Sequence, residues 1–293
     1  GLREIDIASL ETSSLTRDGR STGTKRVDAE ERVTIQMLQN NKTGAKRARV
    51  MRSSEGAPSS MDPTESVLVD YSFPLKGLRV AESSTRLLAE VAYLDSPNNP
   101  ETMPGGFVAE GEGDSQIDMM VTFGASQIEL FDDAGNKLLT DPADRTTDVN
   151  VRMLVPRESY FSLSDEEPEN EQSVSVPYYY FDEVLQKWVL HRDADGKPAY
   201  SHLQDQFGNI LTPRDLALLK HTRDASYDVN GNKLIDPETQ LEMESNIVLD
   251  PQYAPEGVDP QEVRIYSVNK VHHFTTWNCD AGYRAHSYQF DIK

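Results

Sequence analysis

The stretch Glu129-Leu-Phe-Asp-Asp-Ala-Gly-Asn-Lys-Leu138 places an aspartate-led turn with a glycine between two short apolar runs. An aspartate side chain can accept hydrogen bonds from the backbone of a tight turn, and glycine readily adopts the positive φ that such a turn requires. Three further segments repeat the pattern: Leu190-His-Arg-Asp-Ala-Asp-Gly196, Gln204-Asp-Gln-Phe-Gly-Asn-Ile210 and Tyr227-Asp-Val-Asn-Gly-Asn-Lys-Leu234. Repeated hairpins that join short strands are typical of an antiparallel β-sandwich.

Other segments strengthen the β interpretation. Val33, Ile35 and Met37 alternate with polar residues, which is the period of a half-buried strand. Further strand candidates are Val67–Phe73 and Leu87–Leu94, whereas helix signals are sparse. The sequence therefore predicts an all-β fold, built as one antiparallel β-sandwich or as two packed sandwiches, with little helix.

Composition divides the chain into three regions. Residues 1–25 are rich in serine, threonine, glycine and charge, so we expect a flexible linker or tether there. We expect an N-terminal β-sandwich region at 26–110 and a C-terminal β-sandwich at 111–293. The C-terminal region is expected to carry an insertion at about 190–265, which holds three of the four turn segments.

Acidic residues dominate the charge of the 293-residue chain. Aspartate and glutamate total 49 against 29 lysines and arginines, which gives a net charge of −20. Such a surface repels the phosphate backbone of nucleic acids, so we expect no nucleic-acid partner. No run approaches the roughly 18 apolar residues of a membrane-spanning helix, so we expect no transmembrane segment.

Two features bear on the cellular location. Cys279 is the one cysteine, so no disulfide forms within the chain, and many exported bacterial proteins share this property. The chain begins at Gly1 rather than methionine, which suggests that a leader has been removed. We therefore expect an exported protein that is periplasmic, secreted, or held on the outer surface as a lipoprotein by an N-terminal lipid anchor.

A candidate metal site lies around the fourth turn. Asp228, Asn230, Asn232 and Asp236 offer several oxygen ligands within one short segment. Calcium favours such ligands, so calcium is the one cofactor that the sequence suggests. The glycine comes too early for an EF-hand loop, and a plain turn explains the same residues.

The aromatic segment Tyr178-Tyr-Tyr-Phe-Asp182 and the nearby Trp188 admit two interpretations. Alternating aromatic side chains bury a large area on one sheet face, which favours core packing. The sharper alternative is a carbohydrate-binding platform, with Tyr178, Tyr180 and Trp188 as the candidate binding residues.

Three motifs occur in an order that resembles a known group of proteins. They are Met103-Pro-Gly-Gly-Phe107, the aromatic strand that ends near Trp188, and His273-Phe-Thr-Thr-Trp-Asn278. This PGxF and HF[ST]xWN order resembles a group of exported bacterial β-sandwich proteins and lipoproteins. It is also similar to the extracellular regions of astroprincin and cartilage intermediate layer protein. The resemblance implies a β-sandwich in a surface or secreted setting, usually without enzymatic activity.

One specific chemical hypothesis remains. His273-Phe274-Thr275 is also similar to the HF[ST] site of self-cleaving β domains such as the nucleoporin autoprocessing domain. In that chemistry Thr275 attacks the carbonyl of Phe274, and His273 accepts the hydroxyl proton. The alternative is a hydrogen-bonded histidine in a closing strand. Nucleophile elbows, P-loops and dinucleotide-binding motifs are absent from the sequence.

The leading functional prediction is a non-enzymatic cell-surface or secreted module with a binding or structural role. Its partner would be a protein or glycan of the cell envelope. One alternative is an autoproteolytic β domain that cleaves between Phe274 and Thr275. The other is a calcium-stabilised, adhesin-like module that uses the turn around Asp228 and Asp236.

Overall fold

The fold is all-β and almost wholly antiparallel, as the sequence predicts. The computed structural model describes residues 2–53, 64–94, 99–105, 109–110, 116–117, 119–138, 149–156, 159, 175–193, 195–212, 215, 223–224, 234–242, 247–248, 257–259 and 262–283. Within these residues one short 3₁₀ helix, η1 (Pro100–Thr102), accompanies the strands. The parallel pairing among the described strands joins β9 (Ala109–Glu110) to β14 (Lys187–Leu190).

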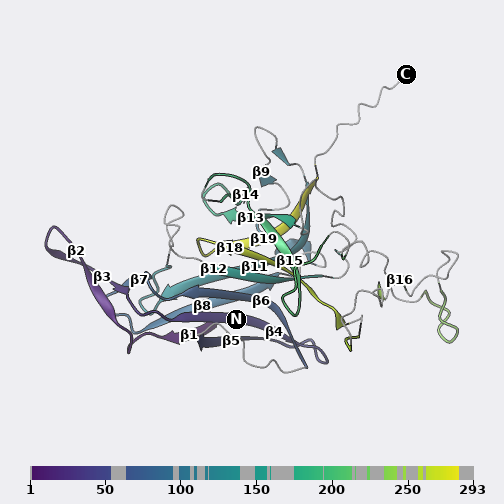
Figure 1. Ribbon diagram of the computed structural model, residues 1–293, viewed down its shortest axis with the longest axis horizontal. Coiled ribbons are helices and arrows are strands. Elements are labelled where there is room, and N and C mark those ends of the chain that lie inside the picture. The colour runs from purple at the N-terminus through teal and green to yellow at the C-terminus, as the bar shows by residue number, and fades with distance from the viewer. Residues whose placement is uncertain are drawn as a thin grey trace, which may run out of the picture.

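One 14-stranded sheet forms most of the molecule (Figure 1). Its main path runs through β1 (Leu2–Asp6), β8 (Arg86–Leu94), β11 (Met119–Asp132), β19 (Thr276–Tyr283), β13 (Ser175–Asp182), β15 (Tyr200–Asp205), β18 (Ile265–Val271), β12 (Val149–Val155), β6 (Glu65–Pro74), β4 (Arg32–Asn40) and β5 (Lys46–Ser53). Strands β9, β10 (Gln116–Ile117) and β14 branch from this path. Two small sheets complete the fold: β2 (Thr12–Arg17), β3 (Arg20–Val27) and β7 (Arg79–Ala81) form one, and β16 (Arg223–Asp224) and β17 (Ile247–Val248) the other.

The large sheet folds over on itself to give the two layers of a sandwich. The hydroxyls of Tyr71 on β6 and Ser126 on β11 share a hydrogen bond of 2.6 Å between the layers. The Tyr93 hydroxyl on β8 donates to the Leu154 carbonyl on β12 at 3.2 Å. Gly124 on β11 has a φ of 141°, and a Cβ atom there would lie 3.0 Å from the same carbonyl oxygen. A residue without a side chain therefore lets β11 approach β12 closely.

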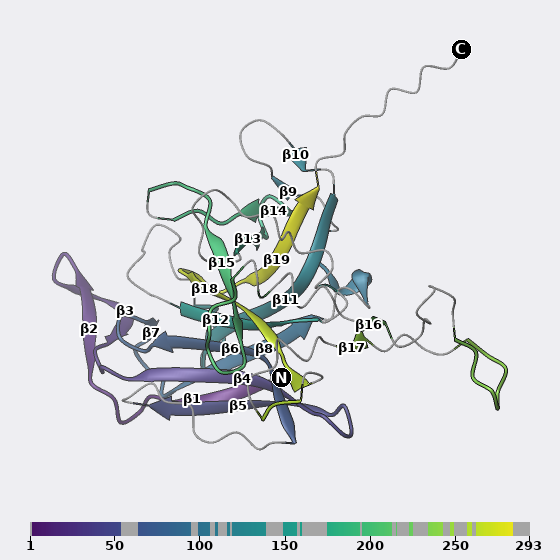
Figure 2. The ribbon, with the colours of Figure 1, turned by 45° about the vertical axis from the view of Figure 1, so that its right-hand side comes forward.

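Inward-facing side chains from both layers fill one large core, and two smaller buried clusters accompany it. Residues that alternate along β4, β6, β8, β11 and β12 are fully buried, including Val33, Ile35, Val69, Tyr71, Leu87, Val91, Phe123, Ile128, Val151 and Met153. The long strands β11 and β19 run side by side (Figure 2). This alternation is the period-2 pattern by which the sequence predicted strands.

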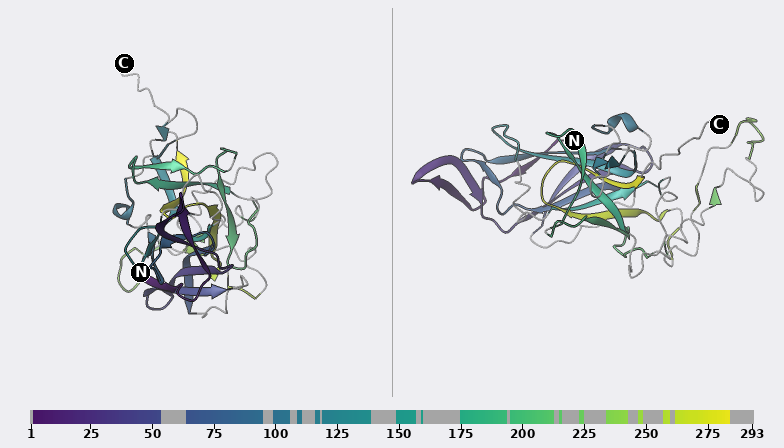
Figure 3. Two further views of the ribbon diagram at one scale, coloured as in Figure 1. Left: turned by 90° about the vertical axis from the view of Figure 1, so that its left-hand side faces the viewer. Right: turned by 90° about the horizontal axis from the view of Figure 1, so that it is seen from above.

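Residues 2–27 form three strands, which corrects the flexible tether expected at 1–25. Strand β1 pairs with β8, and Ile5 and Ile7 are buried in the core. Strands β2 and β3 form a hairpin that projects from one end of the sandwich (Figure 3). Asp18 and Gly19 at its turn both have positive φ, of 52° and 75°, as a tight two-residue hairpin turn requires. Both faces of this hairpin are largely exposed, so its composition resembles that of a linker.

Strands from both sides of the boundary predicted near residue 110 share the large sheet. Strand β8 pairs with β11, and β6 pairs with β12. The insertion expected at about 190–265 also contributes to this sheet, because β15 lies between β13 and β18. The main path of the sheet is therefore continuous across the expected boundaries.

The aspartate-led turns have one shared geometry at the three places where the structure describes them. The Oδ1 atoms of Asp132, Asp193 and Asp205 each accept hydrogen bonds from the backbone N–H groups two and four residues later, at 2.8–3.1 Å. The glycine in the fourth position of each turn has a φ between 78° and 89°. Most of the fourth segment, at 227–234, lies outside the described residues.

Candidate functional site

The predicted aromatic binding residues lie in the interior. Tyr178 is 1% exposed and Trp188 is fully buried, while Tyr180 is partly buried against the core. The ring of Tyr178 stacks on Trp277, with ring centroids 5.2 Å apart and planes 11° from parallel. The Trp188 indole N–H donates to the carbonyl of Pro104 at 3.1 Å. These side chains pack the core, as the first of the two interpretations predicts, and they present no aromatic platform at the surface.

Trp277 is the centre of a buried aromatic cluster. Besides Tyr178, the rings of Tyr180, His191 and His273 lie around it, with centroids 4.8–5.7 Å from the indole. Burial, together with repulsion from His191 and His272, lowers the pKa of His273 to about 4. The imidazole of His273 is therefore neutral at neutral pH.

The Phe274–Thr275 segment has the geometry of a packed strand junction. Thr275 is 6% exposed, and its hydroxyl donates a hydrogen bond to the carbonyl of Phe181 at 3.0 Å. Phe274 packs edge-on against Phe73, with centroids 5.3 Å apart. Among the described residues, positive φ outside glycine occurs at Asp18, Gln186 and Gln240. The hydroxyl proton is thus engaged by a carbonyl, and the backbone here carries no left-handed strain.

Of the predicted calcium ligands, the structure describes Asp236. Its Oδ1 accepts the backbone N–H groups of Glu238 and Thr239 at 2.8 and 2.9 Å, two and three residues later rather than two and four as in the other turns. Asp228, Asn230 and Asn232 lie outside the described residues. In the part of the chain that the structure describes, no group of three or more histidine, cysteine, aspartate or glutamate side chains is arranged to hold a metal ion.

The two end strands of the main sheet path, β1 and β5, come together without a backbone ladder, and we call this junction the seam. Arg3 on β1 donates its Nε–H to the carbonyl of Ala48 on β5 at 2.7 Å. In return, Arg52 on β5 donates an Nη2–H to the carbonyl of Asp6 at the end of β1. Two arginines thus fasten the seam through side chain to backbone hydrogen bonds.

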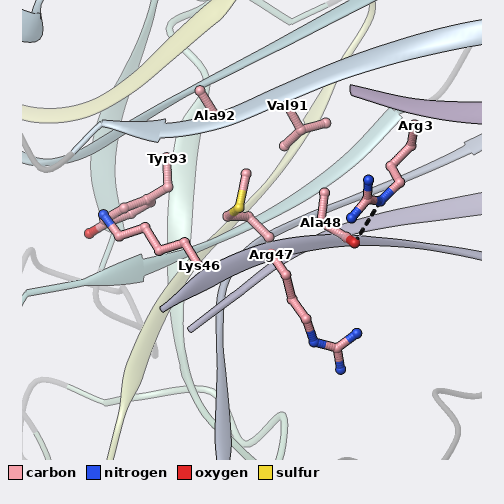
Figure 4. A pocket seen from close by; sticks show the side chains of 8 residues that line it. Arg3, Lys46, Arg47, Ala48, Val91, Ala92 and Tyr93 are labelled. Carbon is pink, nitrogen blue, oxygen red and sulfur yellow. Dashed lines mark hydrogen bonds between the residues drawn. The ribbon is translucent and has the colours of Figure 1, made fainter. Parts of the chain in front are cut away.

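An open cavity of about 330 Å³ lies at the seam, between β5 and β8, and we call it the seam pocket (Figure 4). Its lining residues are Arg3, Met37, Lys46, Arg47, Ala48, Val91, Ala92 and Tyr93. The Lys46 ammonium lies 5.9 Å from the centre of the Tyr93 ring. Arg47 points away from the pocket in Figure 4 and forms two 2.6 Å hydrogen bonds with the Glu65 carboxylate. Arg3 and Lys46 therefore provide the positive charge of the pocket.

Sequence reasoning missed the seam pocket. The segment Lys46-Arg-Ala-Arg-Val-Met-Arg52 concentrates four basic residues in a chain with a net charge of −20. This local reversal of charge was the available signal. The approach of β5 to β1 across the seam follows from tertiary structure, so the sequence alone does not place Arg3 beside this segment.

A polar row crosses four neighbouring strands. Register places Arg49, Gln36, Asp70 and Arg152 opposite one another on β5, β4, β6 and β12. Arg49 donates to the side-chain carbonyl of Gln36 at 2.6 Å, and the Arg152 guanidinium lies 4.0 Å from the centre of the Tyr266 ring. Burial outweighs the attraction of Arg152 and raises the pKa of Asp70 to about 6. This carboxyl group therefore titrates just below neutral pH.

Comparison with protein-family models, with curated proteins and with solved structures found no match for this chain. Within the described residues, no helix has the length and apolar character needed to span a membrane. The functional proposal consequently depends on the geometry of the sites themselves.

Proposed function

We propose that this chain is a non-enzymatic binding module of a cell surface or secreted setting, and that its ligand binds in the seam pocket. The seam pocket carries the proposal, because it combines an apolar lining with two cationic side chains. Ligand sites in proteins commonly join apolar walls to a few placed polar groups, in cavities of roughly 300–1,000 Å³. In the aromatic cluster, in contrast, Trp277, Tyr178 and His191 are buried.

The geometry favours binding over self-cleavage. An attacking Thr275 hydroxyl needs its proton directed toward a base, whereas this proton is donated to the Phe181 carbonyl. The neutral imidazole of His273 packs against Trp277 and Tyr180. Both residues therefore serve the packing of the strand junction.

The setting and the class of partner are part of the proposal. The PGxF and HF[ST]xWN motifs of this chain resemble those of exported β-sandwich proteins. This resemblance supports an exported location. The net charge of −20 argues against a nucleic-acid partner. A protein or glycan of the cell envelope that carries negative charge would suit the local cations of the seam pocket.

A ligand panel with a charge-reversed variant tests the proposal. Thermal unfolding would be followed with anionic, neutral and cationic sugars, peptides and organic acids, for the wild type and for Lys46→Glu. Lys197→Glu is the matched control, because Lys197 is an exposed lysine on the turn before β15. We expect ligands that raise the melting temperature of the wild type and of Lys197→Glu and have less effect on Lys46→Glu. If no ligand raises it, or if all three proteins respond equally, the seam pocket is not the binding site.

The competing functions have their own tests. Intact mass under denaturing conditions should give one species of 32.9 kDa after days at neutral pH. A fragment beginning at Thr275, lost in Thr275→Ala, would instead establish self-cleavage. A melting temperature that rises with calcium and falls with a chelator would favour the calcium-stabilised module.

A further inference from the structure

The hairpin of β2 and β3, with β7 beside it, gathers arginines on one of its faces. Antiparallel pairing places Arg17 on β2 directly opposite Arg20 on β3, and it places Arg26 on β3 directly opposite Arg79 on β7. Directly opposed residues of an antiparallel pair lie on the same face of the sheet. Arg20 and Arg26 are six residues apart on β3, so strand alternation puts both pairs on one face, which we call the arginine face.

Hydrogen bonds of neighbouring side chains agree with this assignment of faces. The hydroxyls of Thr22 and Thr24, which lie between the two arginine pairs, share a hydrogen bond of 2.7 Å. The hydroxyls of Ser14 and Ser21 both donate to the carboxylate of Glu82, at 2.9 and 3.1 Å. Ser21 adjoins Thr22 on β3 and so points to the other face. Glu82 is therefore engaged on the face opposite the arginines.

The arginine face is positively charged in a chain whose net charge is −20. All four arginines are exposed, and Arg26 pairs with Asp28 at 2.9 Å. Among the residues that the structure describes, Arg17, Arg20 and Arg79 have no ion-pair partner. Like charges placed directly opposite each other destabilise a sheet. The two arginine pairs therefore oppose folding, and a negatively charged partner would offset their repulsion.

We infer that the arginine face binds an acidic polysaccharide, a chain of sugars that carry carboxylate or sulfate groups. A guanidinium group can donate two parallel hydrogen bonds to a planar carboxylate, and it pairs in a similar way with other oxyanions. Four residues of β2 separate the two arginine pairs, so the charges are distributed along the hairpin. A chain of repeated anionic units can contact both pairs at once, and such linked contacts raise the overall affinity. The hydroxyls of Thr22 and Thr24 can hydrogen-bond to sugars between the pairs.

The position of the arginine face suits a long ligand. The hairpin projects from one end of the sandwich (Figure 3). Charges on a protein surface that are more than about 10 Å apart are largely screened at 0.1 M salt. A polymer that lies along the hairpin is therefore partly shielded from the acidic remainder of the chain. The arginine face shares no residue with the seam pocket, so it is a second binding site.

Other polyanions fit the arginine face less well. Residues 12–27 include no aromatic side chain, whereas proteins that bind single-stranded nucleic acid stack the bases on aromatic rings. The tip of the hairpin, Arg17-Asp-Gly-Arg20, has no apolar side chain to insert into a lipid bilayer. The outer edge of β2 pairs with no other described strand. An acidic peptide added there would lie beside Arg17 but three strand spacings, about 14 Å, from β7 and Arg79.

Calorimetric titration of the full chain with polygalacturonate, dextran sulfate and neutral dextran tests the inference. We expect an acidic polymer to bind and dextran not to bind, and the acidic polymer that binds identifies carboxylate or sulfate as the favoured group. Arg20→Gln and Arg79→Gln each neutralise one arginine of a pair and should each weaken binding about tenfold. Lys25→Gln is the matched control, because Lys25 pairs with Ser14 on the opposite face, and it should retain the wild-type affinity. Affinity should also fall as salt is raised.

Thermal unfolding separates lost binding from lost structure. Replacing one arginine of an opposed pair removes a repulsion, so Arg20→Gln and Arg79→Gln should melt at or above the wild-type temperature. Lys46→Gln in the seam pocket should bind the acidic polymers as the wild type does, so this inference and the proposed function can fail separately. Absence of binding by both acidic polymers, or equal weakening in Lys25→Gln and Arg20→Gln, would overturn the inference. Tighter binding of polyglutamate or of single-stranded DNA than of either polysaccharide would also overturn it, in favour of an acidic peptide or a nucleic acid.

Discussion

Arg3 donates its Nε–H to the carbonyl oxygen of Ala48 across a seam where two end strands meet without a backbone ladder. In the opposite direction across the seam, Arg52 on β5 donates a hydrogen bond to the carbonyl of Asp6 at the end of β1. An end strand presents unpaired backbone groups that can recruit another chain, and inward-pointing charged side chains are one way to protect them. The two arginines therefore close the side of the sandwich and leave room at the seam for a pocket.

Removing the Arg3 donor should loosen the seam. Arg3→Met keeps most of the side-chain length but leaves the Ala48 carbonyl without its partner, so we expect a loss of about 1–2 kcal/mol in the free energy of unfolding. Amide exchange should quicken in β1 and β5. The control is Arg86→Met, which breaks an exposed ion pair with Glu4 and should cost less than about 1 kcal/mol. Equal losses in the two variants would show that the Arg3–Ala48 hydrogen bond stabilises the fold no more than an exposed ion pair does.

The stability of the aspartate-led turns should depend on the Oδ1 atom of their first residue. Asp205 is 5% exposed, and its Oδ1 accepts from Phe207 and Asn209 at 2.8 and 2.9 Å. Asp205→Ala removes these two bonds and the 2.7 Å bond that Oδ2 accepts from the Asn209 side chain, and it should lower the free energy of unfolding by about 2 kcal/mol. Asp205→Asn retains the Oδ1 acceptor and loses the bond that Oδ2 accepts from Asn209, so its free energy of unfolding should fall by less than that of the alanine variant. Urea denaturation measures both, and a loss in the asparagine variant equal to that in the alanine variant would contradict this role for Oδ1.

The sequence was sufficient for the fold class and for these turns, because both are local. Period-2 alternation in β4, β6 and β8 and the Asp-x-x-Gly pattern each specify structure within a few residues. The strands within residues 2–27 were missed because the β2–β3 hairpin is polar on both faces and so resembles a linker. The seam pocket was missed because Arg3 and Lys46 are brought together by the closing of the sheet, which no local pattern records.

His273 should make the fold less stable in mild acid. Its pKa in the folded protein, about 4, lies below the ordinary value of 6.5, so the unfolded chain takes up a proton first. The contribution of His273 to the free energy of unfolding should therefore fall as pH decreases from 6.5 to 4 and level off below 4. His191 and His272 oppose its protonation, whereas Asp182 favours it. The shift corresponds to roughly 3 kcal/mol at most.

A variant that keeps the ring isolates this effect. His273→Phe should preserve packing against Trp277 and Tyr180 and remove the contribution of His273 to the pH dependence of stability between pH 6.5 and 4. His202→Asn is the control, because His202 is an exposed histidine on β15 and its loss should leave the profile unchanged. Denaturant unfolding at closely spaced pH values gives both profiles. An identical slope in His273→Phe and the wild type would refute the role of His273.

Asp70 should produce the opposite pH dependence. Its pKa in the folded protein, about 6, lies above the ordinary value of 3.8, so the folded chain holds the proton more tightly. The contribution of Asp70 to the free energy of unfolding should fall as pH rises from 3.8 to 6 and level off above 6, by roughly 3 kcal/mol at most. The groups around Asp70 are Gln36 and Arg152 in the adjacent strands, with Tyr266 beside the arginine.

The two titrations overlap between about pH 4 and 6 with opposite signs, so they should largely cancel in the wild type. Asp70→Asn replaces the carboxyl with a neutral amide and should expose the acid lability due to His273. His273→Phe should expose the reverse slope due to Asp70, and the double variant should be nearly flat again. Denaturant unfolding of all four proteins from pH 3.5 to 7 measures these slopes. Slopes of the same sign in the two single variants would mean that one of the two pKa shifts has the wrong direction.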